Sequence, residues 1–565
     1  MPHPFMRISF TSLLILILTF SCASVNSDPT PADRNGLLHS FQSAITEQQL
    51  RDHLYLLADD SLLGRGTGEP GIDMAADYLA SRYAAIGMKT IGDDGTYFQN
   101  FNLNARVNDS IRLDQYRIAG TDTHHVHSST FERGNPAGFY PVLGGELPAE
   151  GRVVYAGLGI RDEARGTDHL GSDISGNWVL IFNDIPYVIG GDTLVSPSIT
   201  NRTRINQILF REGAAGILLI NHTDHDDFAV RAQISANIFG NPVGFQLDYM
   251  QSGRGAPMRS SIISLSPAKA ASLLGIDRSE LENHYNELVS GLAGFSPVMT
   301  DHYIKTTGNS EYRAIPSRNV LSLLEGCDPG LKDEVVVISA HYDHMGLDTP
   351  DADGDYIYNG ADDNGSGTVA ILAIAEALAA ARDSGACPAR SVMFLHVTAE
   401  ERGLLGSRYY SDHPVMPIEN TVANINIDMI GRIDNHYLEE GFGDYLYIIG
   451  AEIISSGLDS LLQVANVKSE NLKLDMRYND LDDPNQFYRR SDHWNFGRLG
   501  VPFAFFFTGV HADYHRPSDT PDKIEYEHYL KRTRVAYSTI IELANAPVRP
   551  VVDSQEFIGR TEQGR

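Results

Sequence analysis

Several His, Asp and Glu residues follow short apolar runs of the sequence, where buried strands would end. The runs are 335–340, 392–397, 422–427 and 503–507, and the residues that follow them are His341, Glu400, Glu401, Asp428 and, a few positions further on, His515. Another carboxylate, Asp363, precedes a segment rich in Ala, Leu and Ile. Ligands of open α/β sheets bind beyond the carboxyl ends of the strands, so we expect these side chains to meet in one crevice.

The residue types in this set are those of a catalytic metal centre. Histidine nitrogen and carboxylate oxygen, without thiolate, suit a zinc ion that keeps one position open for water. A pair of ions about 3.5–4 Å apart needs a bridging carboxylate and terminal ligands on each side. The five candidates that supply this number are His341, Asp363, Glu401, Asp428 and His515. Each alone would more often be an ordinary polar residue, but together they predict metal binding.

Buried strands and helices must alternate to position these residues. The run 335–340 is continuously apolar, as expected for a strand that is covered on both faces. Segment 366–381 has the length and composition of a helix that connects two parallel strands. This alternation predicts an α/β fold with a mostly parallel central sheet flanked by helices.

Length and charge limit the classes of protein. A chain of 565 residues is expected to form two globular units, and its net charge of −29 argues against nucleic acid as a partner. Residues 1–22 have the form of a signal peptide, and Cys22 follows the apolar stretch as in a lipoprotein signal. Two outcomes stay open: lipidation of Cys22 with membrane attachment, or cleavage and release. Either way the sequence predicts an exported protein, which is periplasmic, attached to the outer membrane or secreted.

The remainder divides into a short linker, two parts of one domain and an insertion. We expect the linker at 23–35, the domain at 36–125 and 305–548, and a C-terminal tail at 549–565. Segment 130–300 has short β-like runs bounded by Gly or Asn, and it resembles the protease-associated (PA) domain, a small β-rich module. His222, Asp224 and His225 within it are interpreted as a polar surface loop.

Five motifs together resemble one family of enzymes. They are Ala-His-Tyr-Asp-His, Gly-Ala-Asp-Asp-Asn-Gly-Ser-Gly, Thr-Ala-Glu-Glu-Arg-Gly, Asn-Ile-Asp-Met-Ile-Gly and Tyr-His-Arg-Pro-Ser-Asp-Thr. In order and spacing they are similar to the two-zinc aminopeptidases of the bacterial leucyl aminopeptidase and carboxypeptidase Q type, in peptidase clan MH. The resemblance implies a phosphorylase/hydrolase-like exopeptidase fold. It also implies that Asp363 bridges two zinc ions, with His341 and Asp428 on one and Glu401 and His515 on the other.

The same resemblance implies catalytic roles. Glu400 would be the general base that takes a proton from a water bridged between the zinc ions and passes it to the leaving amine. Asp343 would accept the second N–H of His341 and fix the ring. Tyr514 would either donate to the oxyanion or only pack beneath the site. His344 and His493 have no assigned role.

Three functions stay open on the sequence. An aminopeptidase that removes N-terminal residues from peptides is preferred. A carboxypeptidase or dipeptidase on the same scaffold could hold an α-carboxylate with Arg489 and Arg490. A receptor-like relative without catalysis is disfavoured, because the ligands and Glu400 are all present. Neither the preferred terminal residue nor the oligomeric state follows from the sequence.

Two further features are predicted outside the metal ligands. Cys327 and Cys387 each stand shortly before a predicted strand, and a disulfide forms if those strands are parallel neighbours. The segment 348–355 contains four carboxylates between His341 and Asp363. It could bind Ca²⁺, attract cationic substrates or stay solvated, and the solvated loop is preferred.

Overall fold

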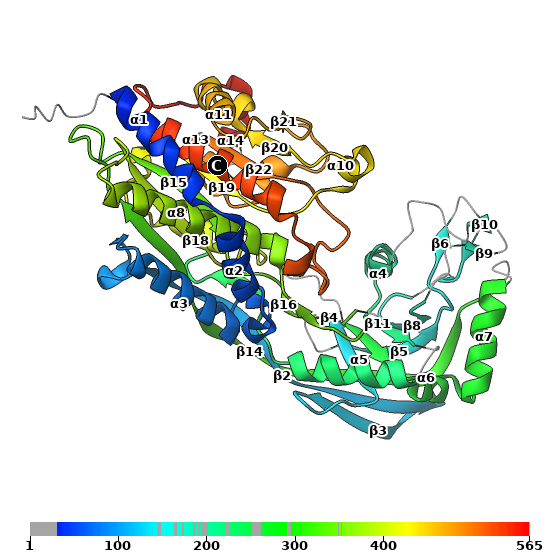
Figure 1. Ribbon diagram of the computed structural model, residues 1–565. Coiled ribbons are helices and arrows are strands. Elements are labelled where there is room, and N and C mark those ends of the chain that lie inside the picture. The colour runs from blue at the N-terminus through cyan, green and yellow to red at the C-terminus, as the bar shows by residue number, and fades with distance from the viewer. Residues whose placement is uncertain are drawn as a thin grey trace, which may run out of the picture.

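The computed structural model of the chain describes residues 31–143, 149–162, 167–171, 174–184, 188–189, 192–193, 202–221, 225–250, 261–290, 295–348, 350–351 and 353–563 (Figure 1). The predicted signal segment 1–22, with Cys22, lies outside the described residues, as do His222 and Asp224. His225 begins a helix, α5, rather than lying in a loop.

A central sheet forms the core of the domain expected at 36–125 and 305–548, which we call the catalytic part. Its strands run in the order β21 (Lys473–Asp475), β20 (Tyr445–Gly450), β22 (Phe503–Phe507), β19 (Thr421–Ile427), β15 (Val335–His341), β18 (Ser391–Val397) and β14 (Val298–Leu324). The pairs β15–β18, β15–β19, β19–β22 and β20–β21 are parallel, whereas β20 pairs antiparallel with β22 and β14 pairs antiparallel with β18. All residues of β15, β18 and β19 are buried, which explains their continuous apolar character and confirms the predicted fold class.

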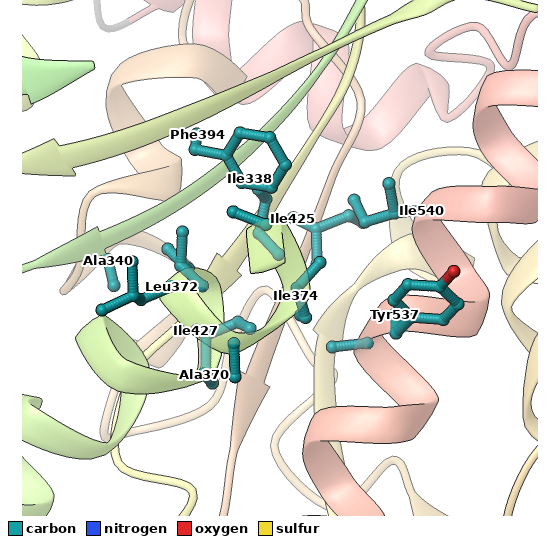
Figure 2. Close-up of a cluster of buried hydrophobic side chains, with 14 of the residues drawn as sticks. Ile338, Ala340, Ala370, Leu372, Ile374, Phe394, Ile425, Ile427, Tyr537 and Ile540 are labelled. Carbon is teal, nitrogen blue, oxygen red and sulfur yellow. The ribbon is translucent and has the colours of Figure 1, made fainter. Parts of the chain in front are cut away.

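Helices cover both faces of this sheet. On one face, α8 (Gly367–Asp383) and α13 (Tyr526–Asn545) pack on alternate residues of the strands, with α2 (Glu47–Leu57) and α3 (Pro70–Ala85) beside them. Figure 2 shows this core, where Ile374 of α8 and Ile540 of α13 meet Ile425 of β19. The opposite face is covered by α9 (Leu405–Asp412) and α12 (His493–Gly497). Among the described helices, only Ala361–Asp383 is long and apolar enough to cross a membrane, and its apolar window is 89% buried in this core.

A long two-stranded ribbon leads out of the sheet. Strands β2 (Phe98–Ala119) and β14 pair antiparallel from Val320↔Phe98 to His302↔Arg117, and β3 (Asp122–Glu132) pairs with the far part of β2. The expected domain boundary near 300–305 therefore lies within β14, and the one near 125–130 lies within β3. In β2 the residues Phe101, Leu103, Ala105 and Val107 are all buried, at every second position.

The inserted segment forms a second core at the far end of the ribbon (Figure 1). Its strands follow the order β5 (Ala149–Tyr155), β8 (Trp178–Phe182), β11 (Gly216–Ile220), β13 (Ile262–Leu265) and β4 (Phe139–Leu143). Around them lie α4 (Arg202–Arg211), α5 (His225–Ile238), α6 (Pro267–Leu274) and α7 (Arg278–Ser290). Strand β12 (Val243–Leu247) returns to pair with β2 next to the catalytic part.

The remaining elements are short or peripheral. The helices are α1 (Pro31–Ser40), α10 (Asn435–Glu440), α11 (Ser456–Lys468) and α14 (Gln555–Gln563). The strands are β1 (Lys89–Thr90), β6 (Arg161–Asp162), β7 (Thr167–Asp168), β9 (Val188–Ile189), β10 (Asp192–Thr193), β16 (Gly346–Leu347) and β17 (Ile357–Tyr358).

Cys327 and Cys387 form a disulfide, with Cα atoms 6.0 Å apart. They precede β15 and β18, which are parallel neighbours joined by α8. The geometry that the sequence predicted for this pair is therefore confirmed.

Candidate metal centre and active site

All five candidate ligands lie at the carboxyl ends of the parallel strands. His341 is the last residue of β15, and Asp428 follows β19 directly. Glu401 lies in the turn after β18, His515 in the loop after β22, and Asp363 in the turn before α8. The strand ends and the loops that follow them therefore bring residues far apart in sequence to one edge of the sheet.

The first group of potential ligands contains His341, Asp363 and Asp428. The Nε2 atom of His341 lies 3.4 Å from Oδ1 of Asp363 and 3.4 Å from Oδ1 of Asp428. All three side chains are buried, and their ligand atoms lie within 4.8 Å of one another. Ser491 donates to Oδ2 of Asp428 at 2.8 Å, which leaves Oδ1 of that carboxylate facing His341.

The second group lies on the other side of Asp363. Nε2 of His515 is 3.0 Å from Oδ2 of Asp363 and 3.4 Å from Oε2 of Glu401. His344, which the sequence left without a role, also reaches this group: its Nδ1 is 2.9 Å from Oε1 of Glu401. The ligand atoms of His344, Asp363 and Glu401 lie within 4.8 Å of one another. His344 and His515 thus both lie close to the carboxylates of Asp363 and Glu401.

Buried polar atoms without hydrogen-bond partners indicate that these side chains can bind metal ions. Oδ2 of Asp363 and Oδ1 of Asp428 are buried without a hydrogen-bond partner. Buried polar atoms are normally paired, so each of these needs a partner such as a cation. Nitrogen and carboxylate oxygen, with no thiolate nearby, are donors that zinc accepts in catalytic sites.

Glu400 lies beside the ligand groups without belonging to either. It lines the same small cavity, of about 40 Å³, as His341 and Asp363. Burial raises the pKa of Glu400 well above its usual value, Glu401 raises it further, and His341 acts in the opposite direction. A carboxyl group in this environment is suited to accept and return a proton.

Asp343 is placed differently from the expectation. Nδ1 of His341 faces the backbone carbonyl of Asp343 at 3.1 Å, whereas the nearest carboxylate oxygen is 3.9 Å away. The Asp343 carboxylate instead accepts the backbone N–H of Glu400 at 3.1 Å and that of Glu401 at 3.4 Å. Asp343 therefore orients the His341 ring through its main chain, and its fully buried side chain fixes the turn that carries the two glutamates.

Tyr514 lines the cavity from the loop that carries His515. Its ring stacks on the imidazole of His515, with centroids 3.8 Å apart. This contact orients the histidine, as the packing interpretation requires. Donation by the hydroxyl to a developing charge stays a prediction.

A second layer of acids, which the sequence interpretation missed, supports the turn of Asp363. The carboxylate of Asp519 accepts the backbone N–H groups of Asp362 and Asp363 at 3.0 and 3.1 Å. Asp362 in turn accepts the N–H of Gly431 at 2.6 Å and lies 3.3 Å from Nε2 of His511. Asp519 belongs to the motif Tyr-His-Arg-Pro-Ser-Asp-Thr, so its presence there was a signal for this role.

Arg65 is the other functional residue that was missed. Its guanidinium is buried, with 1% of the residue exposed, and it pairs with no carboxylate among the described residues. It donates to the backbone carbonyls of Tyr342 at 2.9 Å, Asn359 at 2.7 Å and Gly360 at 2.8 Å, and also to that of Leu57. Arg65 thereby ties together the two segments that carry His341 and Asp363.

The cavity beside the ligands has an apolar wall and one arginine at its mouth. Phe487, Phe505, Phe507 and Val510 line it, together with Arg490. Arg489 is not part of this lining and instead pairs with Gln486. His493 lies behind the wall, stacked on Phe505 with its Nε2 3.1 Å from the carbonyl oxygen of Phe487. We therefore interpret His493 as a packing residue.

The inserted segment touches the turn that carries Glu400. Phe245 and Leu247 of β12 share a buried cluster with Ala399 and Leu405. The guanidinium of Arg402 lies over the ring of Phe245, 5.7 Å from its centroid. This part of the insertion therefore supports the catalytic turn as well as facing it.

The acidic segment 348–355 makes turns with its own carboxylates. Oδ1 of Asp351 accepts the backbone N–H groups of Asp353 and Asp355 at 2.9 and 3.1 Å. Both potential metal groups among the described residues lie in the main site rather than in this segment. The choice among calcium, substrate attraction and solvation stays a prediction, with the self-capped turn favouring solvation.

Comparison with known families supports the resemblance. Residues 319–540 match the model of the family described as "Peptidase family M28". The matched segment contains Glu400 and all five candidate ligands. The family resemblance drawn from the motifs is therefore confirmed for the catalytic part of the chain.

Individual relatives carry aminopeptidase names. A "Probable leucine aminopeptidase" of Arthroderma otae is 27% identical over 285 residues, which are 46% of this chain and 74% of that protein. "Leucine aminopeptidase 1" of Penicillium rubens is 30% identical over 226 residues, 39% of this chain and 55% of that protein. The chain thus spans about half the length of most of the curated relatives that it matches.

Solved structures match over most of the chain. A zinc aminopeptidase from Bacillus subtilis is 17% identical, covering 88% of this chain and 94% of that one, with a TM-score of 0.48. A peptidase M28 precursor from Shewanella amazonensis is also 17% identical, covering 92% and 98%, with a TM-score of 0.48.

Proposed function

We propose that this chain is a zinc-dependent exopeptidase that removes N-terminal residues from peptides, with two zinc ions in the site. His341, Asp363 and Asp428 would hold one ion, and Asp363, Glu401 and His515 the other. His344 would position Glu401 from behind. The names of the relatives support an aminopeptidase.

The observation that carries this proposal is the placement of Asp363. Its Oδ1 faces His341 at 3.4 Å, and its Oδ2 faces His515 at 3.0 Å. A carboxylate with one oxygen facing the histidine of the first ligand group and the other facing a histidine of the second has the arrangement of a bridging ligand. The second-layer contacts from Asp519 fix its backbone in this position.

Glu400 and Asp343 then have separate roles in peptide hydrolysis. Bound zinc supplies a Lewis acid that polarises a carbonyl and lowers the pKa of water. Glu400 accepts the proton of the attacking water on its carboxylate and delivers it to the leaving amine. Asp343 keeps Glu400 in place through the backbone hydrogen bond, so the base is held rigidly beside the reacting atoms.

The cavity is lined by Glu400, Glu401 and Asp428, and Arg490 is its single permanent cation among the described residues. Two bound zinc ions would compensate the charges of their carboxylate ligands, so the charges of the lining do not by themselves distinguish a free amino group from a free carboxylate. The preference for an aminopeptidase therefore rests on the names of the relatives.

A comparison of blocked and free substrates tests this proposal. Leucine p-nitroanilide should be cleaved, cleavage should stop when a chelator removes the metal and return with zinc, and N-acetyl-leucine p-nitroanilide should be inert. Hydrolysis of N-blocked dipeptides in preference to the free amine would overturn the aminopeptidase assignment. It would support the carboxypeptidase alternative, in which Arg490 at the mouth holds the α-carboxylate.

The inserted segment and the N-terminus have proposed roles as well. We take 130–300 as a PA-type domain that restricts access to the site without supplying ligands. A deletion within it that still folds and leaves β12 intact should keep activity on a chromogenic substrate. We also propose that the protein is exported, which the Cys327–Cys387 disulfide supports because such bonds persist in oxidising compartments.

A further inference from the structure

A cavity of about 220 Å³ lies where the inserted segment meets the catalytic part, and we call it the junction pocket. Its lining from the insertion comprises Val142 of β4, Ser235 and Ile238 of α5, Phe239, and Ile262 of β13. From the catalytic part it is lined by Thr67, Glu69, Met345, Leu347, Asp348 and Arg402. Figure 1 shows β4, α5 and β16 together at this junction.

Two residues of the catalytic wall of the junction pocket are sequence neighbours of residues in the second ligand group. Met345 directly follows His344, and Arg402 directly follows Glu401. Arg402 donates to the carbonyl of Met345 at 3.1 Å, which joins these two segments. A ligand in the junction pocket therefore lies against the same segments that carry the second group of ligands.

Thr67 makes a second connection. Its hydroxyl donates to Oδ2 of Asp343 at 3.3 Å, and that carboxylate holds the turn of Glu400. Thr67 itself lines the junction pocket. The pocket is thus separated from the catalytic turn by a single layer of side chains.

The lining combines apolar side chains with two charged groups that do not pair with each other. Arg402 has no carboxylate within ion-pair distance among the described residues, and its Nε is buried without a partner. Glu69 accepts from Asn241 at 2.9 Å through one oxygen, and its other oxygen is unpartnered. Burial raises the pKa of Glu69 to about 7, although Arg402 and a backbone hydrogen bond from Leu347 lower it.

These groups match the chemistry of a peptide. Ile238, Phe239, Ile262 and Leu347 provide a surface for an apolar side chain. A guanidinium is a donor for backbone carbonyls and for a C-terminal carboxylate. A carboxyl such as that of Glu69 accepts peptide N–H groups. Arg402 can thus donate to the carbonyls of a peptide main chain, and Glu69 can accept from its N–H groups.

We propose that the junction pocket is a subsite for the part of the peptide substrate beyond the scissile bond. It takes an apolar side chain, and Arg402 meets a carbonyl or the terminal carboxylate of the same segment. This inference rests on the proposed function, which places the N-terminal residue in the small cavity beside the ligands. It adds that the enzyme selects peptides of several residues with an apolar residue downstream.

A set of peptides tests the subsite in the full-length, zinc-loaded enzyme. Leu-Gly-Gly-Gly-Gly is compared with versions in which one glycine beyond the scissile bond is replaced by leucine. Burial of one leucyl side chain should raise kcat/KM about tenfold or more at one position. Ser235→Phe, which fills the pocket from α5, should abolish that gain and leave kcat/KM for leucine p-nitroanilide within about twofold.

The matched control is Gln233→Phe. Gln233 lies on the same helix, is exposed and does not line the pocket, so the leucine gain should persist in this variant. Arg402→Met should lower kcat/KM for the peptides more than for leucine p-nitroanilide.

Several outcomes overturn the subsite. Equal kcat/KM for all peptides with the wild-type enzyme is one such outcome. Another is that Ser235→Phe lowers kcat/KM equally for every substrate, because that indicates a structural effect. If free leucine changes p-nitroanilide turnover and Ser235→Phe removes that change, the pocket binds an effector instead. Failure of the proposed function is distinguishable, because leucine p-nitroanilide is then inert in the wild-type enzyme as well.

Discussion

Replacement of Arg65 by lysine should weaken zinc binding although Arg65 touches no candidate ligand side chain. The guanidinium donates to four backbone carbonyls from Leu57, Tyr342, Asn359 and Gly360. Lysine keeps the charge, but its three N–H groups on one atom cannot reach carbonyls arranged around a planar fork. At least two carbonyls should therefore lose their donor.

The size of the effect follows from this geometry. A buried polar group without a partner costs about 1–3 kcal/mol, so two orphaned carbonyls reduce the free energy of unfolding by about 2–6 kcal/mol. The affected segments lead directly into His341 and Asp363. Outer residues that orient metal ligands typically contribute about 10–100-fold to metal affinity, and we expect a loss of zinc affinity in that range.

Two measurements separate this positioning role from general destabilisation. Zinc affinity is measured by chelator competition, and stability by denaturant unfolding of the metal-free protein. Arg390→Lys is the matched control, because Arg390 is also buried, pairs with Glu334 at 2.6 Å and donates to the carbonyl of Ala546, far from the ligands. The reasoning is refuted if both variants lose stability and neither loses zinc affinity.

Three further variants test the assigned roles. Glu400→Gln should keep its metal and lose about 10²–10⁴ in kcat, because it removes a base and no ligand; near-normal kcat with zinc bound would exclude Glu400. Asp363→Ala should lose zinc, since among the described residues no other carboxylate faces His341 and His515 at once, and full double occupancy by elemental analysis would contradict the bridge. Cys327→Ser with Cys387→Ser should lower the free energy of unfolding by about 4 kcal/mol in the chain-entropy model for the loop that the disulfide closes, and unchanged denaturant midpoints would reject this value.

Much of the fold was predictable because the strands that carry the site are buried on both faces. The runs 335–340, 392–397 and 422–427 are continuously apolar for that reason, and each became a parallel strand with its polar residue at the carboxyl end. The disulfide followed from the same reasoning, since parallel neighbours place Cys327 and Cys387 at one edge.

Other features required the tertiary structure. Arg65 has no motif of its own, and its partners are backbone carbonyls, which leave no mark on the sequence. The carboxylate of Asp343 stands two residues after His341, yet it bonds to the turn of Glu400, because the direction of a loop side chain is not set by spacing. Strand β2, by contrast, carried a readable signal in the alternation of Phe101, Leu103 and Ala105.

The pairing of β2 with β14 limits the order in which the parts of the chain can fold. Phe98 pairs with Val320, so β2 leaves the ribosome long before the strand that completes it. Until then its apolar face has no partner in the catalytic sheet, and closing so long a loop is entropically unfavourable. The insertion, which lies wholly between the two strands, can collapse first and shorten that loop. Its early folding would then bring the far ends of β2 and β14 together and fix the register in which the rest of the two strands pair.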